Sequence, residues 1–280
     1  MTDDGVQAFP DRGGRARART SGDRSGLGQY RPEWGMIFPV TSTVVLVHGA
    51  WHGAWCFDRV VPLLEAAGVP VMAIDLPGHG RDPGPFADLH GDAGRVVSTL
   101  DGINGPALLL GHSYGGAVIT EAGVHPAVTH LVYLCAMALD RGESCGAAAV
   151  DQAASLSHEG RPDIGEKLIL HSDGTSSLDP STAAACLYND CDPETVAWGV
   201  ANLGRQPMTN FGQTPSAVAW RERPSTYVAC SDDLVVHPGL QDLLAQRCTS
   251  TYIWSTGHSP FASDPQRLAR LLVELAESER

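Results

Sequence analysis

The stretch Gly111-His112-Ser113-Tyr114-Gly115-Gly116 decides the fold, because it lies between the apolar run Ala107–Leu110 and the helix-compatible segment Ala117–Ala122. A serine between a buried strand and a helix stands on a sharp turn that presents its hydroxyl to a cleft. The two glycines that flank the serine at a distance of two residues suit such a turn, since larger side chains there would collide with neighbouring backbone. We therefore predict that Ser113 is a nucleophile. The alternative is a glycine-rich turn whose serine only caps the next helix.

A serine hydroxyl is a poor nucleophile at neutral pH, so a general base has to lie within hydrogen-bonding reach. His258 is the best placed of the eleven histidines, because it follows the strand-like run Thr251–Ser255 and precedes the last helical stretch. A loop at the carboxyl end of a strand can reach the nucleophile. His112 adjoins the serine but is expected to point the wrong way if the turn exposes the Ser113 hydroxyl. We expect the remaining internal candidates to be ordinary packed or surface residues, namely His125, His130 and His171.

The carboxylate that orients the base has two adjacent candidates, Asp232 and Asp233, at the end of the apolar run Ser225–Cys230. Asp140 follows another apolar run and is a third candidate from a different strand end. The chain order serine, aspartate, histidine is the one expected when a parallel α/β sheet carries the three groups at successive strand ends.

The negative charge of a tetrahedral intermediate requires backbone N–H donors aimed at the oxygen. We predict two donors. One is the amide of Tyr114, directly after the nucleophile, and the other is the amide of Ala50, in a turn after the apolar strand Thr43–Val47. His48-Gly49 is also compatible with a plain strand terminus, and the two roles can coexist.

Apolar strands alternate with helical patterns through the first half of the chain, which predicts an α/β fold with a mostly parallel central sheet flanked by helices. The strands expected there are Val44–Val47, Val71–Ile74, Ala107–Leu110 and Leu131–Cys135. The alternation stops between Ala138 and Glu222 and resumes from Ser225, with helices over Pro238–Arg247 and Asp264–Glu277. We therefore predict a core formed by residues 36–137 and 223–280, with residues 138–222 as an inserted cap or lid that includes a helical piece at Pro193–Leu203.

Residues 1–35 are dominated by Gly, Arg and Asp and show no hydrophobic period, so we expect a disordered N-terminal tail. The abrupt change in composition makes Met36 a candidate for the true start of the protein.

The 280-residue chain has a net charge of −13 at pH 7, which argues against nucleic acid or an anionic membrane as a partner. No apolar stretch has the length of a membrane span or the position of a signal peptide, so we expect a cytoplasmic protein whose partner is a small-molecule substrate. A homo-oligomer is left open. The seven cysteines form no metal-like cluster, and a disulfide between Cys186 and Cys191 is disfavoured in a reducing compartment.

Five segments together resemble the α/β-hydrolase superfamily, and in particular its esterase and hydroxynitrile lyase branch. The resemblance extends from about Thr43 to the C-terminus and rests on Val45–Trp55, Ile74–Gly80, Gly111–Ile119, Tyr227–Asp233 and Gly257–Pro265. It implies the α/β-hydrolase fold, and it aligns Asp233 with the catalytic acid better than Asp232.

Two departures from the lyase pattern favour hydrolysis. The lyases carry a lysine directly after the catalytic histidine, where this chain has Ser259, and tend to carry a hydroxyl residue at the position of Gly49. The resemblance therefore implies a serine hydrolase that uses water as its second substrate and needs no metal or organic cofactor.

Side chains near the expected site predict the substrate class. Trp51, His52 and Tyr114 are candidates to bind substrate, and Phe211 and Trp198 could join them, although ordinary packing is the commoner role of aromatic residues. We expect a small to medium, uncharged, fairly apolar carboxylic ester. Two other functions stay open on the same fold, a ligand receptor with little turnover and a specialised biosynthetic enzyme without net hydrolysis.

Overall fold

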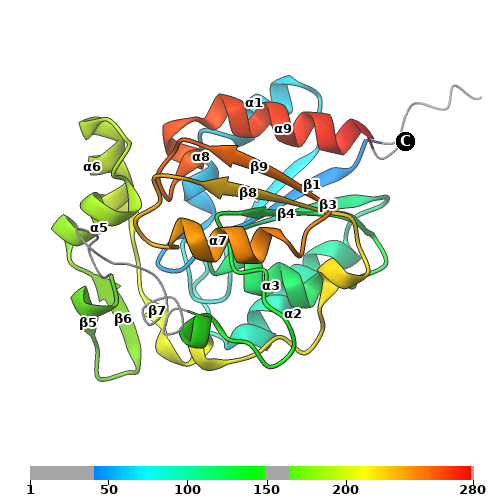
Figure 1. The fold of residues 1–280 in the computed structure, drawn as a ribbon. Helices are drawn as coiled ribbons and strands as arrows, with labels where there is room; N and C mark the ends of the chain where they lie inside the picture. Colours follow the sequence, from blue (N-terminus) through cyan, green and yellow to red (C-terminus); the bar gives the residue numbers. More distant parts are fainter. Residues whose placement is uncertain (1–40, 149–163, 279–280) are drawn as a thin grey trace, which may run out of the picture. The chain divides into compact units, whose positions relative to one another are not determined.

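A sheet of parallel strands in the order β2-β1-β3-β4-β8-β9 forms the centre of the fold in the computed structural model, which describes residues 41–148 and 164–278 (Figure 1). Residues 1–35 and Met36 lie outside the described residues. The strands of this sheet are β1 (Thr43–Val47), β2 (Val71–Ile74), β3 (Ala107–His112), β4 (Val128–Leu134), β8 (Ser225–Cys230) and β9 (Ser250–Trp254). They agree with the expected strands to within a few residues at each end, and every neighbouring pair is parallel.

Burial along the strands follows their place in the sheet. β3 and β8 are buried at every position, as expected for strands covered on both faces, whereas β9 lies at an edge and is exposed except at Trp254. The register pairs Val44 with Val71 on one side of β1 and Thr43 with Ala107 on the other.

Helices cover both faces of the sheet. Figure 1 shows α1 and α9 on one face and α2, α3 and α7 on the other. The helices and the 3-10 turn of this part are η1 (Ala54–Phe57), α1 (Val61–Ala66), α2 (Leu89–Asp101), α3 (Gly115–Ala122), α7 (Pro238–Ala245), α8 (Pro260–Ser263) and α9 (Pro265–Ser278). Leu268, Leu271 and Leu272 of α9 are buried, and their three- and four-residue spacing places them on the helix face that contacts the core.

The strand order changes direction at β1, because β2 pairs with one side of β1 and β3 pairs with the other. In open parallel sheets, the loops that leave two such strands diverge and form a crevice at the carboxyl ends. The turns after β1 and β3 therefore flank the place where a ligand site is expected in this fold.

The chain between β4 and β8, residues 135–224, is called the insertion here. Its described part contains a small antiparallel sheet in the order β5-β6-β7, which sequence analysis did not anticipate. The elements of the insertion are η2 (Gly165–Lys167), β5 (Leu168–Leu170), β6 (Thr175–Leu178), α5 (Pro180–Leu187), α6 (Pro193–Asn202), β7 (Gln206–Pro207), η3 (Met208–Gly212) and η4 (Ala219–Arg221). Asp179 and Asp192 cap the first turns of α5 and α6, and a proline follows each cap, which is a typical helix start.

The seven cysteines, which all lie in the described part of the chain, form no disulfide bond, so Cys186 is not linked to Cys191 by one. Across residues 41–148 and 164–278, none of the helices combines the length and apolar character that crossing a bilayer requires.

Candidate active site

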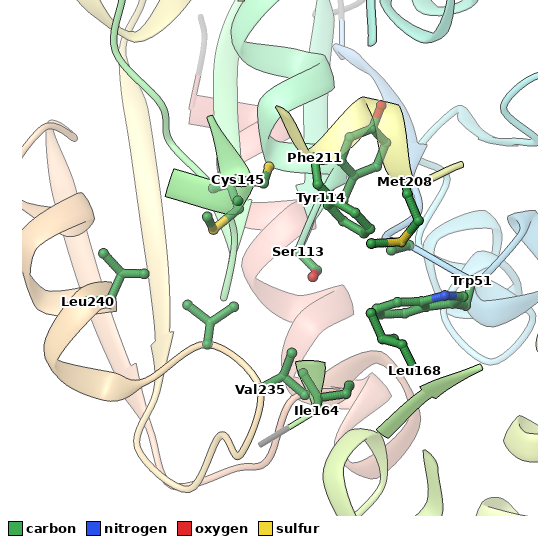
Figure 2. A pocket seen from close by; sticks show the side chains of 14 residues that line it. Trp51, Ser113, Tyr114, Cys145, Ile164, Leu168, Met208, Phe211, Val235 and Leu240 are labelled. Carbon is green, nitrogen blue, oxygen red and sulfur yellow. The ribbon is translucent and has the colours of Figure 1, made fainter. Parts of the chain in front are cut away.

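Ser113 stands on the turn between β3 and α3, in a left-handed backbone conformation with φ of +52°. The turn is as tight as its glycines suggest, because a Cβ at Gly115 would lie 2.6 Å from the backbone oxygen of His48. Backbone bonds to β4 and to the loop after it hold the turn in place, with Ser113 N donating to Leu134 O at 3.2 Å and Met137 N donating to Ser113 O at 3.1 Å. Figure 2 shows the Ser113 hydroxyl directed into a cavity. The strained turn thus presents the hydroxyl rather than burying it.

His258 and Asp233 are brought together from the loops that follow β9 and β8. His258 Nδ1 lies 2.9 Å from Asp233 Oδ2, and both side chains are buried. The carboxylate also accepts from the Val235 and Val236 amides at 2.7 and 3.0 Å and from Gln241 Nε2 at 2.9 Å. Because a carboxylate oxygen accepts at Nδ1, that nitrogen carries the proton, and Nε2 retains the lone pair that a general base needs.

The two competing carboxylates occupy other environments. Asp232 is exposed, and its side chain accepts a hydrogen bond from Ser231 at 3.3 Å. Asp140 pairs with Arg221, which donates from Nε at 3.1 Å and lowers the pKa of the carboxyl. Of the three candidates, only Asp233 contacts an imidazole through the bonds that the described residues make.

His112 supports the loop that carries His258. Its Nε2 donates to the His258 backbone oxygen at 2.8 Å, and the thiol of Cys135 donates to the same oxygen at 3.3 Å. Burial lowers the pKa of His112 well below its usual range, so the ring is neutral at pH 7. The rings of His112 and His258 lie 4.7 Å apart between centroids, which places the base beside the nucleophile turn.

One ligand atom each from His112, Cys135 and His258 lies within 4.8 Å of the others, a spacing that could hold a metal ion. The sequence shows no sign of this grouping, because the three residues are far apart in the chain. Two of them already donate to one carbonyl oxygen, and we assign them to holding the loop. The three histidines that the sequence analysis set aside bond elsewhere: His125 with Asp101, His130 with Thr226 and His171 with Ser177.

No hydrogen bond joins the Ser113 hydroxyl to the His258 imidazole among the bonds formed by residues 41–148 and 164–278. Catalytic hydrogen bonds are often long without substrate and tighten when it binds. The nucleophile and the base are therefore neighbours whose direct contact stays a prediction.

Ala50 and Tyr114 both line the cavity beside Ser113, and both are buried. Neither backbone N–H donates to an acceptor within the described part of the chain. Buried amides without partners are uncommon and call for an explanation. The turns that carry them are close together, since a Cβ at Gly49 would lie 2.9 Å from Ser113 Cβ and 2.8 Å from His112 Nδ1. The same closeness explains why a hydroxyl residue does not fit at Gly49.

The turn after β1 is fixed by side chains on both sides. His48 Nδ1 donates to Gly49 O at 2.8 Å, and His48 Nε2 accepts from Leu76 N at 3.1 Å. Trp51, at φ of +63°, donates from its indole to Ser176 at 3.1 Å and so joins the turn to the insertion. Unpaired amides in a rigid turn are preorganised donors for an oxyanion.

His52 has a different position from the one expected, because it does not line the cavity in the described part of the chain. Its Nδ1 donates to Ala50 O at 2.8 Å, and its Nε2 accepts from the Tyr188 hydroxyl at 2.9 Å. Burial lowers the pKa of His52 to about 4, which keeps the ring neutral. With both nitrogens bonded, His52 braces the turn of Ala50, and its contact with substrate stays a prediction.

The cavity at Ser113 has a volume of about 230 Å³, and its lining is almost entirely apolar (Figure 2). Trp51 and Phe211 belong to the lining. Trp198 instead packs against Trp55, with the ring centroids 5.2 Å apart, and the Arg59 guanidinium lies over its ring. The lining residues are Ala50, Trp51, Ser113, Tyr114, Met137, Cys145, Gly146, Ile164, Leu168, Met208, Phe211, Val235, Val236 and Leu240. None of these carries a charge at neutral pH, since burial raises the pKa of the Cys145 thiol to about 12.

Sequence reasoning missed Gln241, although α7 was expected. Gln241 is buried and bonds to Asp233, and it also accepts from the Cys230 amide at 2.9 Å. The available signal was a glutamine on the apolar side of a helix that directly follows the candidate acid.

The model of the alpha/beta hydrolase family matches residues 44–271. A pyrethroid hydrolase from Sphingobium wenxiniae is 28% identical over 255 residues, which cover 84% of this chain and 88% of the relative. Norfluorocurarine synthase 2 from a Strychnos species is 28% identical over 262 residues, covering 83% and 94%. Among solved structures, a pyrethroid hydrolase from Sphingobium faniae JZ-2 aligns with a TM-score of 0.73 at 28% identity, covering 85% of this chain and 98% of that one.

Proposed function

The chain belongs to the alpha/beta hydrolase family, and we propose on this basis that it is a serine hydrolase that cleaves a small to medium, uncharged, fairly apolar carboxylic ester. Relatives include esterases and hydrolases, which supports ester hydrolysis in general. The observation that carries the proposal is the arrangement around one cavity: the Ser113 hydroxyl, the unpaired amides of Ala50 and Tyr114, and the buried Asp233–His258 pair nearby.

The reaction passes through an acyl-enzyme. Ser113 Oγ forms a bond to the ester carbonyl carbon while its proton moves to His258 Nε2, and the amides of Ala50 and Tyr114 stabilise the charge on the carbonyl oxygen. The bond from carbon to the alcohol oxygen then breaks, and His258 returns the proton to that oxygen. Water repeats the sequence: it attacks the acyl carbon, gives a proton to His258, and the proton returns to Ser113 as the acid leaves. Asp233 holds the imidazole in the required tautomer throughout.

The lining of the cavity supports an ester that is apolar on both sides of its carbonyl. In Figure 2, Val235 and Leu240 lie on one side of the Ser113 hydroxyl, and Met208 and Trp51 lie on the other. A volume of about 230 Å³ is below the range of about 300–1,000 Å³ typical of ligand pockets, which favours a compact substrate. Because one relative is named a pyrethroid hydrolase, a pyrethroid is an informative bulky test compound.

We also infer that the insertion acts as a cap, as the sequence predicts for residues 138–222. Ile164, Leu168, Met208 and Phe211 of this segment line the cavity at Ser113. A cytoplasmic location and the oligomeric state stay predictions from the sequence.

The test is hydrolysis of p-nitrophenyl butyrate by the full chain and by Ser113→Ala. We expect kcat/KM to fall by about 10⁴-fold or more, because nucleophile and base act as one unit. Ser98→Ala, which changes an exposed serine on α2, should leave hydrolysis unchanged. A fluorophosphonate should label Ser113 stoichiometrically, as judged by peptide mass spectrometry. Near-native hydrolysis by Ser113→Ala would refute the proposal.

A biosynthetic role without net hydrolysis is the second candidate, and the similarity to a protein named norfluorocurarine synthase 2 is the observation that favours it. Short acyl nitrophenyl esters separate the alternatives. A burst followed by turnover supports the hydrolase, a stoichiometric burst without turnover supports a ligand receptor, and no reaction favours the biosynthetic enzyme.

A further inference from the structure

A buried polar network lies behind one wall of the cavity and joins three separate segments. The Tyr114 hydroxyl donates to Asp92 Oδ2 at 2.6 Å, and Asn210 Nδ2 donates to the same oxygen at 3.0 Å. Asn210 Nδ2 also donates to the Tyr114 hydroxyl at 3.1 Å. Asp92 and Asn210 are fully buried and Tyr114 is 2% exposed. The network therefore connects α2, the nucleophile turn and η3 of the insertion at one point.

Further bonds attach the segment around η3 to the start of α2. Asn210 Nδ2 donates to Ala87 O at 3.1 Å. Gln213 accepts from Leu89 N at 2.8 Å and donates to Asp88 at 3.0 Å. Two side chains of the insertion, Asn210 and Gln213, thus hold the α2 N-terminus. These side-chain bonds hold η3 against the core, because β7, which precedes η3, pairs with β6 of the insertion and not with the central sheet.

The stability of the fold does not by itself explain why a carboxyl is buried at position 92. A buried carboxyl is costly to desolvate, and an apolar residue of similar volume would often serve as well or better. The second oxygen, Asp92 Oδ1, has no partner among the described residues, which adds to that cost. Buried polar groups that are hydrogen-bonded to one another instead fix the arrangement of the segments that carry them. We therefore look for the role of Asp92 in the side chains that the network holds in position.

The network positions aromatic side chains that line the cavity. Phe211 follows Asn210 in the chain, and its ring lies 6.0 Å from that of Tyr114 and 5.9 Å from that of Trp51. Met208 belongs to the same short turn and also lines the cavity. The backbone of Tyr114 is held separately, because its oxygen accepts from Ala117 N at 2.9 Å in the first turn of α3. The network therefore governs the ring of Tyr114 and the place of η3 more than the Tyr114 amide.

We propose that Asp92 and Asn210 are positioning residues which set the apolar wall formed by Tyr114, Met208 and Phe211, and thereby the affinity for the apolar group of the ester. The inference rests on the proposed function and adds specificity determinants that touch neither the substrate nor the reacting atoms. Because Asp92 and Asn210 act on the shape of the wall, their substitution should affect KM more for an ester whose group against the wall is larger.

The test compares Asp92→Ala and Asn210→Ala with the wild type on p-nitrophenyl acetate and p-nitrophenyl butyrate. We expect KM for the butyrate to rise about tenfold in each variant, with kcat within about threefold, because a wall displaced by loss of these bonds contacts the butyryl group less closely, and a tenfold change corresponds to about 1.4 kcal/mol. KM for the acetate should change by less than about twofold, since its acyl group is too small to depend on the wall. Asp92→Ala/Asn210→Ala should resemble the single variants, because residues of one network are not additive.

Conservative and matched variants separate positioning from a general loss of structure. Asp92→Asn keeps an oxygen that can accept from Tyr114 and Asn210, so it should restore KM for the butyrate to within about threefold of the wild type. Asn202→Ala removes an exposed amide on α6 that donates to Trp198 O in the same helix, and it should leave the hydrolysis of both esters unaffected. If Asp92→Ala unfolds, Asn210→Ala carries the comparison on its own.

The inference fails if Asn210→Ala leaves KM for the butyrate unchanged, or if it lowers kcat equally on both esters. It also fails if Asp92→Asn is as impaired as a folded Asp92→Ala. In each of these cases Ser113-dependent hydrolysis persists and the proposed function stands. A wild-type protein that hydrolyses neither ester overturns the proposed function, and the inference then falls with it.

Discussion

Replacing Asp92 by asparagine should remove a pH-dependent part of the stability of the fold. Burial raises the pKa of the Asp92 carboxyl from 3.8 to about 7. Hydrogen bonds from Tyr114 and Asn210 lower this pKa, nearby Asp88 raises it, and Arg95 lowers it. In the unfolded chain the Asp92 carboxyl loses its proton near the ordinary pKa of an aspartate, whereas in the folded chain it keeps the proton up to about neutral pH. Between these values the folded state binds more protons, so stability falls as the pH rises.

The magnitude follows from the two pKa values. A shift from 3.8 to about 7 corresponds to a loss of about 4 kcal/mol over the whole range, of which about 2.5 kcal/mol falls between pH 5 and pH 8. Asp92→Asn cannot ionise and has nearly the same shape. The stability of the variant relative to wild type should therefore increase by about 2.5 kcal/mol across that interval.

Urea unfolding followed by tryptophan fluorescence at several pH values between 5 and 8 measures this difference. Asp101→Asn is the matched control, because Asp101 lies on the same helix with its side chain 69% exposed. Its stability should follow the wild type at every pH, apart from a small effect of the exposed pair with His125. Parallel pH profiles for wild type and Asp92→Asn would show that Asp92 does not hold a proton to neutral pH, and the reasoning would be refuted.

Three other substitutions test the site. Asp233→Asn should lower kcat by about 10⁴-fold, because the imidazole loses the group that fixes its tautomer. Asp232→Asn changes the exposed residue directly before it and should leave kcat near the wild-type value. Equal effects of the two variants in a steady-state assay would contradict the assignment of the acid. Gln241→Ala should lower kcat by about tenfold or more with little change in KM, because it removes a donor to the acid, and an altered KM alone would count against that role. Gly115→Ala should destabilise the fold by about 1–3 kcal/mol, because its Cβ would lie 2.6 Å from backbone. Gly94 has open space around it, so Gly94→Ala should stabilise α2 slightly. Thermal unfolding measures both effects.

The core of the fold could be predicted because its signals are local. The strands before Ser113 and Asp233 are short apolar runs between turn residues, and the structure has them within a few residues of the expected bounds. The glycines beside Ser113 likewise indicated the tight turn that the structure contains. These features depend on neighbours in the chain, so the sequence carries them directly.

The features that could not be predicted depend on distant partners. β5, β6 and β7 have only 3, 4 and 2 residues, and β6 is the polar run Thr175–Leu178, so no periodicity marks them. His52 was expected near the apolar pocket, and the sequence does not show that its ring bonds to Tyr188, 136 residues away. Asp92 resembles any charged residue of an amphipathic helix until its partner Asn210, 118 residues later, is in place.

The origin of the parts around Ser113 has a consequence for redesign. The groups proposed for bond breaking come from loops of the central sheet, while Ile164, Leu168, Met208 and Phe211 come from the insertion. Grafting the corresponding segment of another family member would thus exchange much of the wall and leave the reacting atoms in their native frame. Such a chimaera would have to carry its own equivalent of Asn210, since this side chain of the insertion bonds to Asp92 of the core. A change of substrate selectivity in this scaffold therefore requires that the bonds between the grafted segment and the recipient core are matched as well.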